Sequence, residues 1–245
     1  MIVGTARLED LQANRPKLAG FDAAPLSLPG ASVLQAMFEM PVAAREALVP
    51  PGLHPTNPAA LVIQAWRCPS SPWGAFSLVQ ARAQTRSGVR PRGFVLGAAC
   101  DNREAGEALA VGFGFPALPA EIRLQRSYDK VLLEVVRGER TILALEGLDP
   151  DPLAAGDVQF SGTLNLADTP NGWRLVQLDP ELTPTRSERL RPKLSAFVPA
   201  AWGDARIDPY YPVSASITQA DISIPAIRFV CKPGELAFTG TEKVG

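Results

Sequence analysis

Residue types that bind transition metals or form nucleophile–base pairs are scarce in this 245-residue chain. Its one histidine, His54, lies in a loop-like Gly-Leu-His-Pro sequence and cannot alone supply a zinc site or a Ser-His pair. The three cysteines, Cys68, Cys100 and Cys231, are widely spaced, and their odd number predicts reduced, buried thiols. We therefore expect neither a metal site nor a bound cofactor.

Lysine is the remaining residue type that could act as a covalent catalyst, because a neutral amine forms a Schiff base with a carbonyl compound. Such an amine needs burial or a neighbouring positive charge to lower its pKa. The five lysines lie near the chain ends, in a turn or beside prolines in expected loops: Lys17, Lys130, Lys193, Lys232 and Lys243. These positions do not predict an activated amine, and a relocated amine stays an alternative.

The composition is typical of a folded, soluble protein. Hydrophobic residues make up 46% and charged residues 20%, which is enough apolar surface for a core. The 24 Lys and Arg residues nearly balance the 25 Asp and Glu residues, so we expect neither nucleic acid nor a membrane as partner. No apolar run approaches about 18 residues, and the first residues do not resemble a secretory signal, so we expect a cytoplasmic protein.

The hydrophobic pattern predicts mostly strands. Short apolar or alternating runs predict them at 61–67, 76–86, 93–100, 131–136, 141–145, 159–166, 173–178 and 213–230. Helices are expected at 41–48 and at 101–111, where Asp101 precedes Glu104 with the spacing of a capping box. This order predicts an α+β fold of mostly antiparallel strands. We expect an irregular arm over residues 1–30 and one domain over residues 31–245.

The most specific pattern is the segment Pro91–Leu124, PRGFVLGAACDNREAGEALAVGFGFPALPAEIRL. A strand leads to Asp-Asn, a helix follows, and Gly-Phe-Pro precedes another strand. This segment resembles the centre of the acetoacetate decarboxylase-like superfamily, and Val49–Leu53 and Ser70–Phe76 resemble two of its loops. The resemblance implies a cone-like barrel of antiparallel strands with an interior pocket and few helices, as a homo-oligomer.

The resemblance also implies a type of chemistry, Schiff-base catalysis, which in members of the superfamily is carried out by the first lysine of a Pro-Lys-Lys sequence. The second lysine, a neighbouring positive charge, lowers the pKa of the first. Here Ala117 and Leu118 follow Pro116 at these two positions. We therefore expect no Schiff base at the family position and no ordinary acetoacetate decarboxylation.

The other aligned pocket positions change in the same direction. The family's substrate-binding arginine aligns near Glu39, and its two pocket glutamates align with Ile63 or Gln64 and with Leu78. Such a pocket is more apolar than that of the family. It has no cation to bind a carboxylate at the positions of the family's lysines and arginine. We expect a small-molecule ligand that is larger, neutral or weakly polar, such as a polyketide-, terpenoid- or lipid-like carbonyl compound. A pocket filled by its own side chains is the competing account.

Glu39 is the candidate general base, with a pKa raised by burial; the alternative is an exposed acid ahead of a helix. The residues expected to contact a ligand lie in or beside the aligned pocket: Ile63, Gln64, Arg67, Leu78, Gln80, Cys100, Phe115, Ala117 and Leu118. Arg67 and Cys100 each have a second interpretation, as a surface arginine and as core packing. Asp101 could face the pocket mouth, but its spacing to Glu104 favours helix capping.

Two hypotheses for function follow. The first is an enzyme that isomerises, cyclises, hydrates or cleaves an apolar carbonyl compound through acid–base groups and shape. The second is a non-catalytic small-molecule binding protein of the same fold. Turnover that needs no added cofactor would separate the first from the second.

Overall fold

Strands account for most of the structure, a computed structural model that describes residues 3–245. In chain order they are β1 (Leu26–Glu39), β2 (His54–Pro55), β3 (Ala60–Cys68), β4 (Phe76–Ser87), β5 (Arg90–Cys100), β6 (Ala117–Pro119), β7 (Glu121–Arg126), β8 (Lys130–Arg137), β9 (Arg140–Leu153), β10 (Gly162–Thr169), β11 (Gly172–Leu178), β12 (Glu181–Phe197), β13 (Tyr211–Ile224), β14 (Phe229–Cys231) and β15 (Thr241–Lys243). The helical segments are α1 (Leu8–Leu11), α2 (Val42–Leu48), α3 (Arg103–Phe113), η1 (Ala155–Asp157), η2 (Pro199–Trp202) and α4 (Ala237–Gly240). Each run predicted as a helix or strand overlaps one of these elements.

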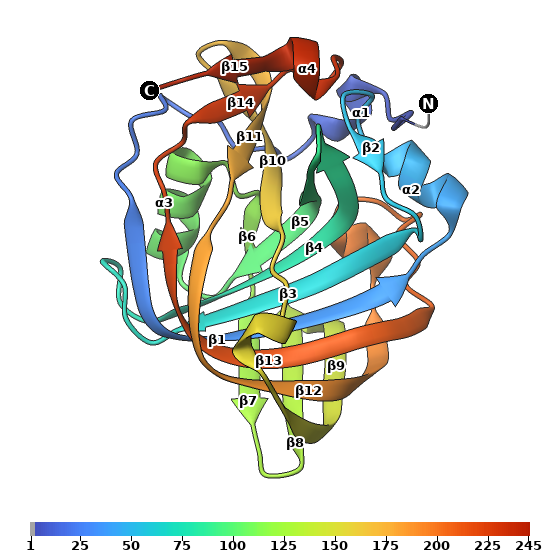
Figure 1. Cartoon of the computed structure of the whole chain (residues 1–245), viewed down its shortest axis with the longest axis vertical. Coiled ribbons are helices and arrows are strands. Elements are labelled where there is room, and N and C mark those ends of the chain that lie inside the picture. Colours follow the sequence, from blue (N-terminus) through green and yellow to red (C-terminus); the bar gives the residue numbers. More distant parts are fainter. Residues whose placement is uncertain (1–2) are drawn as a thin grey trace.

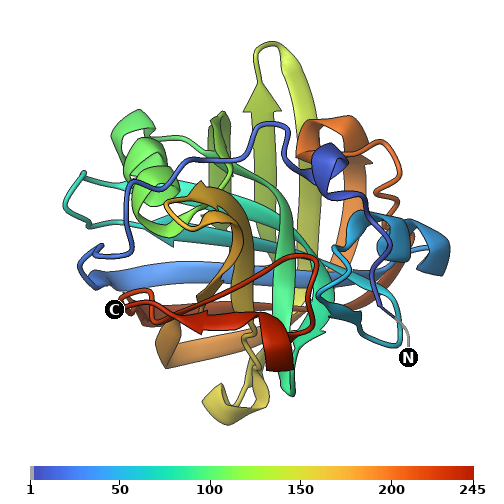
Figure 2. The same ribbon diagram turned by 90° about the horizontal axis from the view of Figure 1, so that it is seen from above.

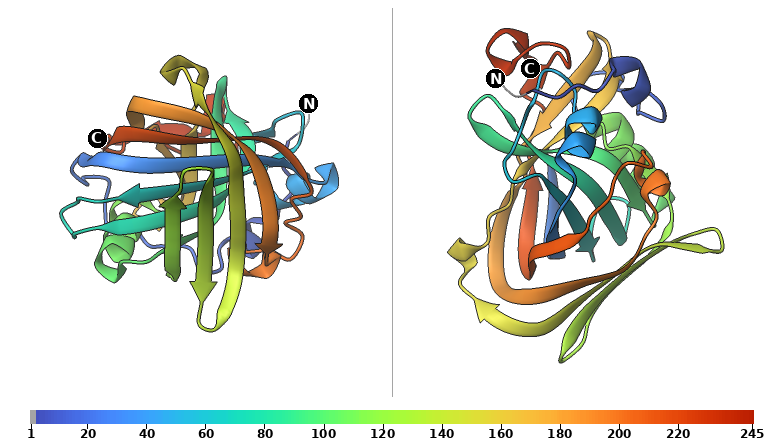
Figure 3. Two further views of the ribbon diagram at one scale, coloured as in Figure 1. Left: turned by 90° about the horizontal axis from the view of Figure 1, so that it is seen from below. Right: turned by 90° about the vertical axis from the view of Figure 1, so that its right-hand side faces the viewer.

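These strands form one sheet in the order β15-β14-β11-β10-β5-β4-β3-β1-β13-β12-β9-β8-β7, with β2 beside β4 and β6 beside β5. Strands β10 and β6 run parallel to β5, and the other strand pairs are antiparallel. The sheet curls until β7 contacts β4 (Figures 1 and 3). The strands from β4 to β7 therefore enclose an open cone rather than a closed barrel. The predicted α+β fold of mostly antiparallel strands is confirmed.

Helix α3 packs outside the cone against β5 and β6 (Figure 1). Its N-cap is Asn102, which has an extended backbone and accepts a hydrogen bond from the Ala105 amide at 3.0 Å. The prediction that Asp101 caps this helix is wrong by one residue, because the short side chain of Asn102 already reaches the first turn. The Asp101 carboxylate instead accepts a hydrogen bond from the Ser77 amide at 2.6 Å.

The segment before β1 crosses the outside of the sheet (Figure 2). Of the expected arm at 1–30, residues 1 and 2 lie outside the described part of the chain, and β1 begins at Leu26. The Leu18 amide ties this segment to β10 by donating to the Asp168 carbonyl at 2.8 Å. Within residues 3–245 no helix is both long and apolar enough to cross a membrane.

The curled sheet has a core on each face, because successive residues of a strand point to opposite sides. The barrel-side core lies inside the cone and includes Leu34, Ala65, Val79, Leu124 and Leu145. The helix-side core lies between the outer face, α3 and the N-terminal segment, and includes Val33, Trp66, Leu78, Leu109 and Phe115. One layer of strands therefore separates two places where a site could form.

Candidate functional site

Most residues predicted to line a pocket converge on the helix-side face. Six of them lie there: Gln64, Leu78, Gln80, Cys100, Phe115 and Ala117. The glutamines belong to this face because they pair directly across β3 and β4, in the same rows as Trp66 and Leu78. These positions, which are distant in the sequence, therefore lie on one face of the sheet.

Apolar packing closes this region. The rings of Trp66 and Phe115 meet edge to face, with centroids 6.1 Å apart and an interplanar angle of 72°. Trp66 is 1% exposed, and Leu78 and Phe115 are 0% exposed. Leu78, which we expected to align with a family glutamate, therefore contributes to a packed core rather than to a solvent-filled pocket.

The two thiols of this core are also enclosed. Burial raises the pKa of Cys68 to about 12 and that of Cys100 to about 11. Helix α3 approaches Cys100 closely at Gly106, where an added Cβ would lie 3.3 Å from the Cys100 Cβ. A protonated, buried thiol is a poor nucleophile, so the geometry favours core packing for Cys100.

Ala117 and Leu118, which we expected to align with the two family lysines, point in different directions. Ala117 pairs with Ala98 and packs against the helix-side core, beside a cavity of about 260 Å³ under α3. Leu118 pairs with Ala99, a barrel-side residue, and also lines a cavity of about 210 Å³ beside Trp202. Side chains at these two positions lie on opposite faces of β6.

A row of glutamines crosses the same face. Trp66 Nε1 donates to Gln64 Oε1 at 3.0 Å, and Gln64 Nε2 donates to Gln35 Oε1 at 3.1 Å. Gln35 Nε2 in turn donates to the Gln159 carbonyl at 3.0 Å. Gln80 continues this row, and neither of its amide atoms has a hydrogen-bond partner among the described residues. Gln64 therefore has a structural role, and Gln80 is left for another partner.

Two other predicted residues lie apart from this face. Ile63 is a fully packed member of the barrel-side core, with 1% exposure. Glu39 ends β1, and its carboxylate accepts a hydrogen bond from the Tyr210 hydroxyl at 3.3 Å near the surface. Neither residue joins the six helix-side positions.

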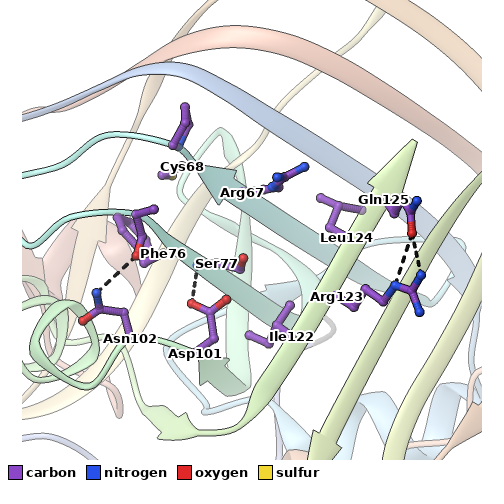
Figure 4. A pocket seen from close by; sticks show the side chains of 12 residues that line it. Arg67, Cys68, Phe76, Ser77, Asp101, Asn102, Ile122, Arg123, Leu124 and Gln125 are labelled. Atoms are coloured by element: carbon purple, nitrogen blue, oxygen red, sulfur yellow. Dashed lines mark hydrogen bonds between the residues drawn. The ribbon is translucent and has the colours of Figure 1, made fainter. Parts of the chain in front are cut away.

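Arg67 lies in a cleft of about 970 Å³ on the barrel side (Figure 4). This cleft opens between β7 and the ends of β3, β4 and β5. Its lining residues are Arg67, Cys68, Pro69, Ala75, Phe76, Ser77, Asp101, Asn102, Ile122, Arg123, Leu124 and Gln125. Apolar side chains of β7, Ile122 and Leu124, form its floor, and charged side chains stand at its rim.

Most polar groups of the cleft already have partners. Asp101 and Ser77 exchange two hydrogen bonds, from Ser77 N to Asp101 Oδ1 at 2.6 Å and from Asp101 N to Ser77 O at 3.2 Å. Arg123 donates to Gln125 Oε1 at 2.7 Å through Nη2. The exposed guanidinium of Arg67 makes no hydrogen bond or ion pair with any residue that the structure describes. Arg67 is therefore the group most open to a ligand; the sequence did not link it to Asp101.

The lysines lie elsewhere. Lys130 and Lys193 both approach Glu146, at 3.8 and 3.3 Å, and Lys232 pairs with Glu235 at 2.9 Å. Lys17 and Lys243 are exposed. In the described residues, no lysine lines the cleft or the cavity beside Ala117.

The sequence pattern of the acetoacetate decarboxylase (ADC) family matches residues 14–170, more than half of the chain. The chain therefore belongs to the acetoacetate decarboxylase family. A search of curated proteins gives no match.

Solved structures share the fold at low sequence identity. Acetoacetate decarboxylase from Legionella pneumophila subsp. pneumophila str. Philadelphia 1 has 17% identity and a TM-score of 0.73, over 84% of this chain and 86% of that one. An acetoacetate decarboxylase-like enzyme from Sphingomonas wittichii RW1 has 15% identity and a TM-score of 0.68, over 91% and 95%. The enduracididine biosynthesis enzyme MppR, complexed with pyruvate, has 16% identity and a TM-score of 0.64, over 82% and 87%.

Proposed function

We propose that this chain is a lysine-independent member of its family that binds a larger, mostly apolar carbonyl compound in the barrel-side cleft. It isomerises, cyclises, hydrates or cleaves this compound by acid–base chemistry. The free guanidinium of Arg67 above an apolar floor carries the proposal. The helix-side core supports it, because Ala117 offers no amine and Leu78 is closed off from solvent.

Arg67 is suited to bind the carbonyl oxygen. A guanidinium that donates hydrogen bonds to this oxygen stabilises the negative charge that develops when a neighbouring C–H bond loses its proton. The floor formed by Ile122 and Leu124 suits the apolar body of the ligand. In this arrangement Arg67 is the electrophilic group and the floor determines ligand size.

Asp101 is suited to act as the base. Its Oδ1 accepts from the Ser77 amide, so Oδ2 is the oxygen available to a ligand. Ser77 also pairs with Arg67 across β3 and β4, which places Asp101 and Arg67 about 10 Å apart at the backbone, two strand spacings. The reacting carbon and its carbonyl fit between the two side chains.

Glu39 is the base expected from the sequence, and it lies at the other end of β1. Ser32, which pairs with Arg67, is separated from Glu39 by about 23 Å along the strand. A ligand held by Arg67 therefore reaches Asp101 more readily than Glu39. Neutral variants of Asp101 and Glu39 therefore test which of the two acids is the base.

The binding test is a thermal-shift screen with small keto acids and with larger neutral carbonyl compounds. We expect neutral compounds to raise the Tm, and Arg67→Ala to abolish that increase. Arg123→Ala is the control, because that arginine lines the same cleft and already donates to Gln125. An Arg67-dependent increase with keto acids alone would contradict the proposed ligand class.

The catalytic test follows conversion of the stabilising compound by mass spectrometry. We expect Asp101→Asn, which keeps an acceptor for Ser77, to slow turnover by about 10²–10⁴-fold, and Glu39→Gln to leave it unchanged. Binding without conversion would favour the second candidate, a non-catalytic binding protein. The existing bond between Asp101 and the Ser77 amide is the observation that supports this alternative.

A further inference from the structure

Arg82 is a fully enclosed cation on the helix-side face of β4, with 0% of its surface exposed. Its side chain lies across β5, because a Cβ added at Gly93 would be 3.0 Å from the Cδ of Arg82 and 3.1 Å from its Nε. Because Gly93 has no Cβ, the Arg82 side chain can pass over it and its guanidinium reaches β10. There Nη1 donates a long hydrogen bond of 3.4 Å to the Ser161 carbonyl.

The remaining edge of this guanidinium is unused. Neither Nε nor Nη2 of Arg82 has a partner among the described residues. These two atoms form the edge that binds both oxygens of one carboxylate side by side. Five other arginines of this chain hold a carboxylate with this edge: Arg7 with Asp10, Arg92 with Asp179, Arg126 with Glu188, Arg174 with Glu242 and Arg206 with Asp204.

Unpartnered polar atoms gather around Arg82. They are both amide atoms of Gln80, the hydroxyl of Thr163 and Oδ1 of Asn165. Thr163 pairs with Gly93 in the parallel ladder of β10 and β5, so it lies beside the backbone that Arg82 crosses. Gln80 lies two residues before Arg82 on β4, and Asn165 lies two residues after Thr163 on β10. Both side chains are therefore on the same face as Arg82. Buried polar atoms are rarely left without partners, and a group of them on adjacent strands indicates a missing one.

The missing partner must be an anion. Burial lowers the pKa of Arg82 to about 10, so the side chain is still protonated at neutral pH. No ion pair links it to an acid of residues 3–245. The amide nitrogen of Gln80 and the hydroxyl of Thr163 can donate hydrogen bonds beside the guanidinium edge.

We propose that Arg82, Gln80 and Thr163 form a buried site for the carboxylate of a small organic acid. The Nε and Nη2 atoms of Arg82 bind its two oxygens, and Gln80 and Thr163 donate the flanking hydrogen bonds. The rest of the acid lies against the apolar helix-side core. The Ser161 carbonyl, which accepts from Nη1, lies at the other edge of the guanidinium.

This site is independent of the cleft proposed above, because the sheet separates the two. Residues of β4 that face the cleft, such as Ser77, alternate with those that face Arg82. Loss of one binding activity therefore need not affect the other. Variants of Arg67 and Arg82 distinguish a failure of this inference from a failure of the proposed function.

The test compares butyrate, butyramide and chloride by thermal shift and by calorimetric titration. Butyramide has the same shape without the charge, and chloride is an anion without two oxygens. We expect butyrate alone to raise the Tm of the wild-type protein and of Arg67→Ala. Arg82→Met should abolish this increase while leaving the unliganded protein at least as stable, because it removes an unpaired buried charge.

A second variant guards against misfolding of Arg82→Met. Thr163→Val keeps the shape of the side chain and removes one donor, so we expect butyrate to bind about tenfold more weakly. An equal Tm increase with chloride, an increase that persists in Arg82→Met, or unchanged affinity in Thr163→Val would overturn the inference. So would the absence of any response to butyrate in the wild-type protein.

Discussion

The two faces of the curled sheet differ in how their charged side chains are partnered. On the barrel side, Glu188 lies beside Ile217 and binds Arg126 through two hydrogen bonds of 2.9 and 3.0 Å, while Asp101 is held by Ser77. On the helix side, Arg82 is buried without an acid. The barrel side holds these acids with hydrogen bonds and leaves Arg67 exposed to solvent, whereas the helix side encloses Arg82 in a closed core without an acid.

In the proposed account, this chain has lost the family site while it keeps the family fold. At Leu78 and Ala117, which we expect to align with charged residues of the family, apolar side chains pack in this core, so packing rather than solvation stabilises this face. The open cleft lies on the other face and keeps its guanidinium free. Binding in this chain is therefore expected to depend on arginines rather than on lysines.

Replacing the aromatic centre of the closed face should have the largest effect. Trp66→Ala removes a buried ring and its contact with Phe115, so we expect a loss of about 3–5 kcal/mol in the free energy of unfolding. Trp73→Ala is the matched control, because Trp73 also meets a phenylalanine edge to face, Phe76 at 6.3 Å, but is only half-buried. Urea unfolding that gives similar losses for both variants would contradict a closed helix-side core.

The thiols of the closed face should resist modification. Because burial raises the pKa of Cys100 to about 11, we expect its reaction with a disulfide reagent near pH 8 to be about a hundredfold slower than in the unfolded chain. Cys68, with a pKa of about 12, should react more slowly still. The measurement is the absorbance of released thiolate with and without denaturant, and rapid labelling of the folded protein would mean that this face opens.

The paired charge of the open face should give a smaller, pH-dependent effect. Hydrogen bonds from Arg126 hold the pKa of the Glu188 carboxyl below its usual range. A lowered pKa in the folded state stabilises the protein above the unfolded pKa of about 4.3, and this stabilisation is lost as the pH falls through the folded value.

We therefore expect Glu188→Gln to cost about 1–3 kcal/mol at pH 7 and much less at pH 3. Urea unfolding of both proteins across this pH range tests the sign. Glu146→Gln is a control at a more exposed carboxylate, whose side chain is 26% exposed against 8% for Glu188. A constant difference at all pH values would show that the charge of Glu188 does not stabilise the fold.

Local patterns predicted much of the fold. The segment from β5 through α3 to β6 was found because its turn and capping residues are close in sequence, with an error of one residue at the cap. The strand β12 was not predicted, because Pro184 and Pro192 argue against a strand. In the structure Pro184 precedes a register shift in the pairing with β13, where its missing N–H is tolerated.

The candidate site was only partly predictable, because alternation along a strand does not reveal which face is buried. Gln80, Arg82 and Gln84 alternate with alanines, a pattern typical of a strand with one solvated face. In the structure both faces of β4 are covered, and Arg82 is enclosed. The contact between Asp101 and Ser77 depends on the register of β4 and β5, which the sequence alone does not determine.

Lysine independence is the central claim, and trapping with borohydride tests it most directly. The native protein is incubated with acetoacetate, or with the carbonyl compound that most raises its Tm, then reduced with borohydride and weighed by intact-mass spectrometry. We predict the same mass as for protein treated with borohydride alone. A mass increase of one reduced adduct that maps to a single lysine, and that disappears in urea, would contradict the account.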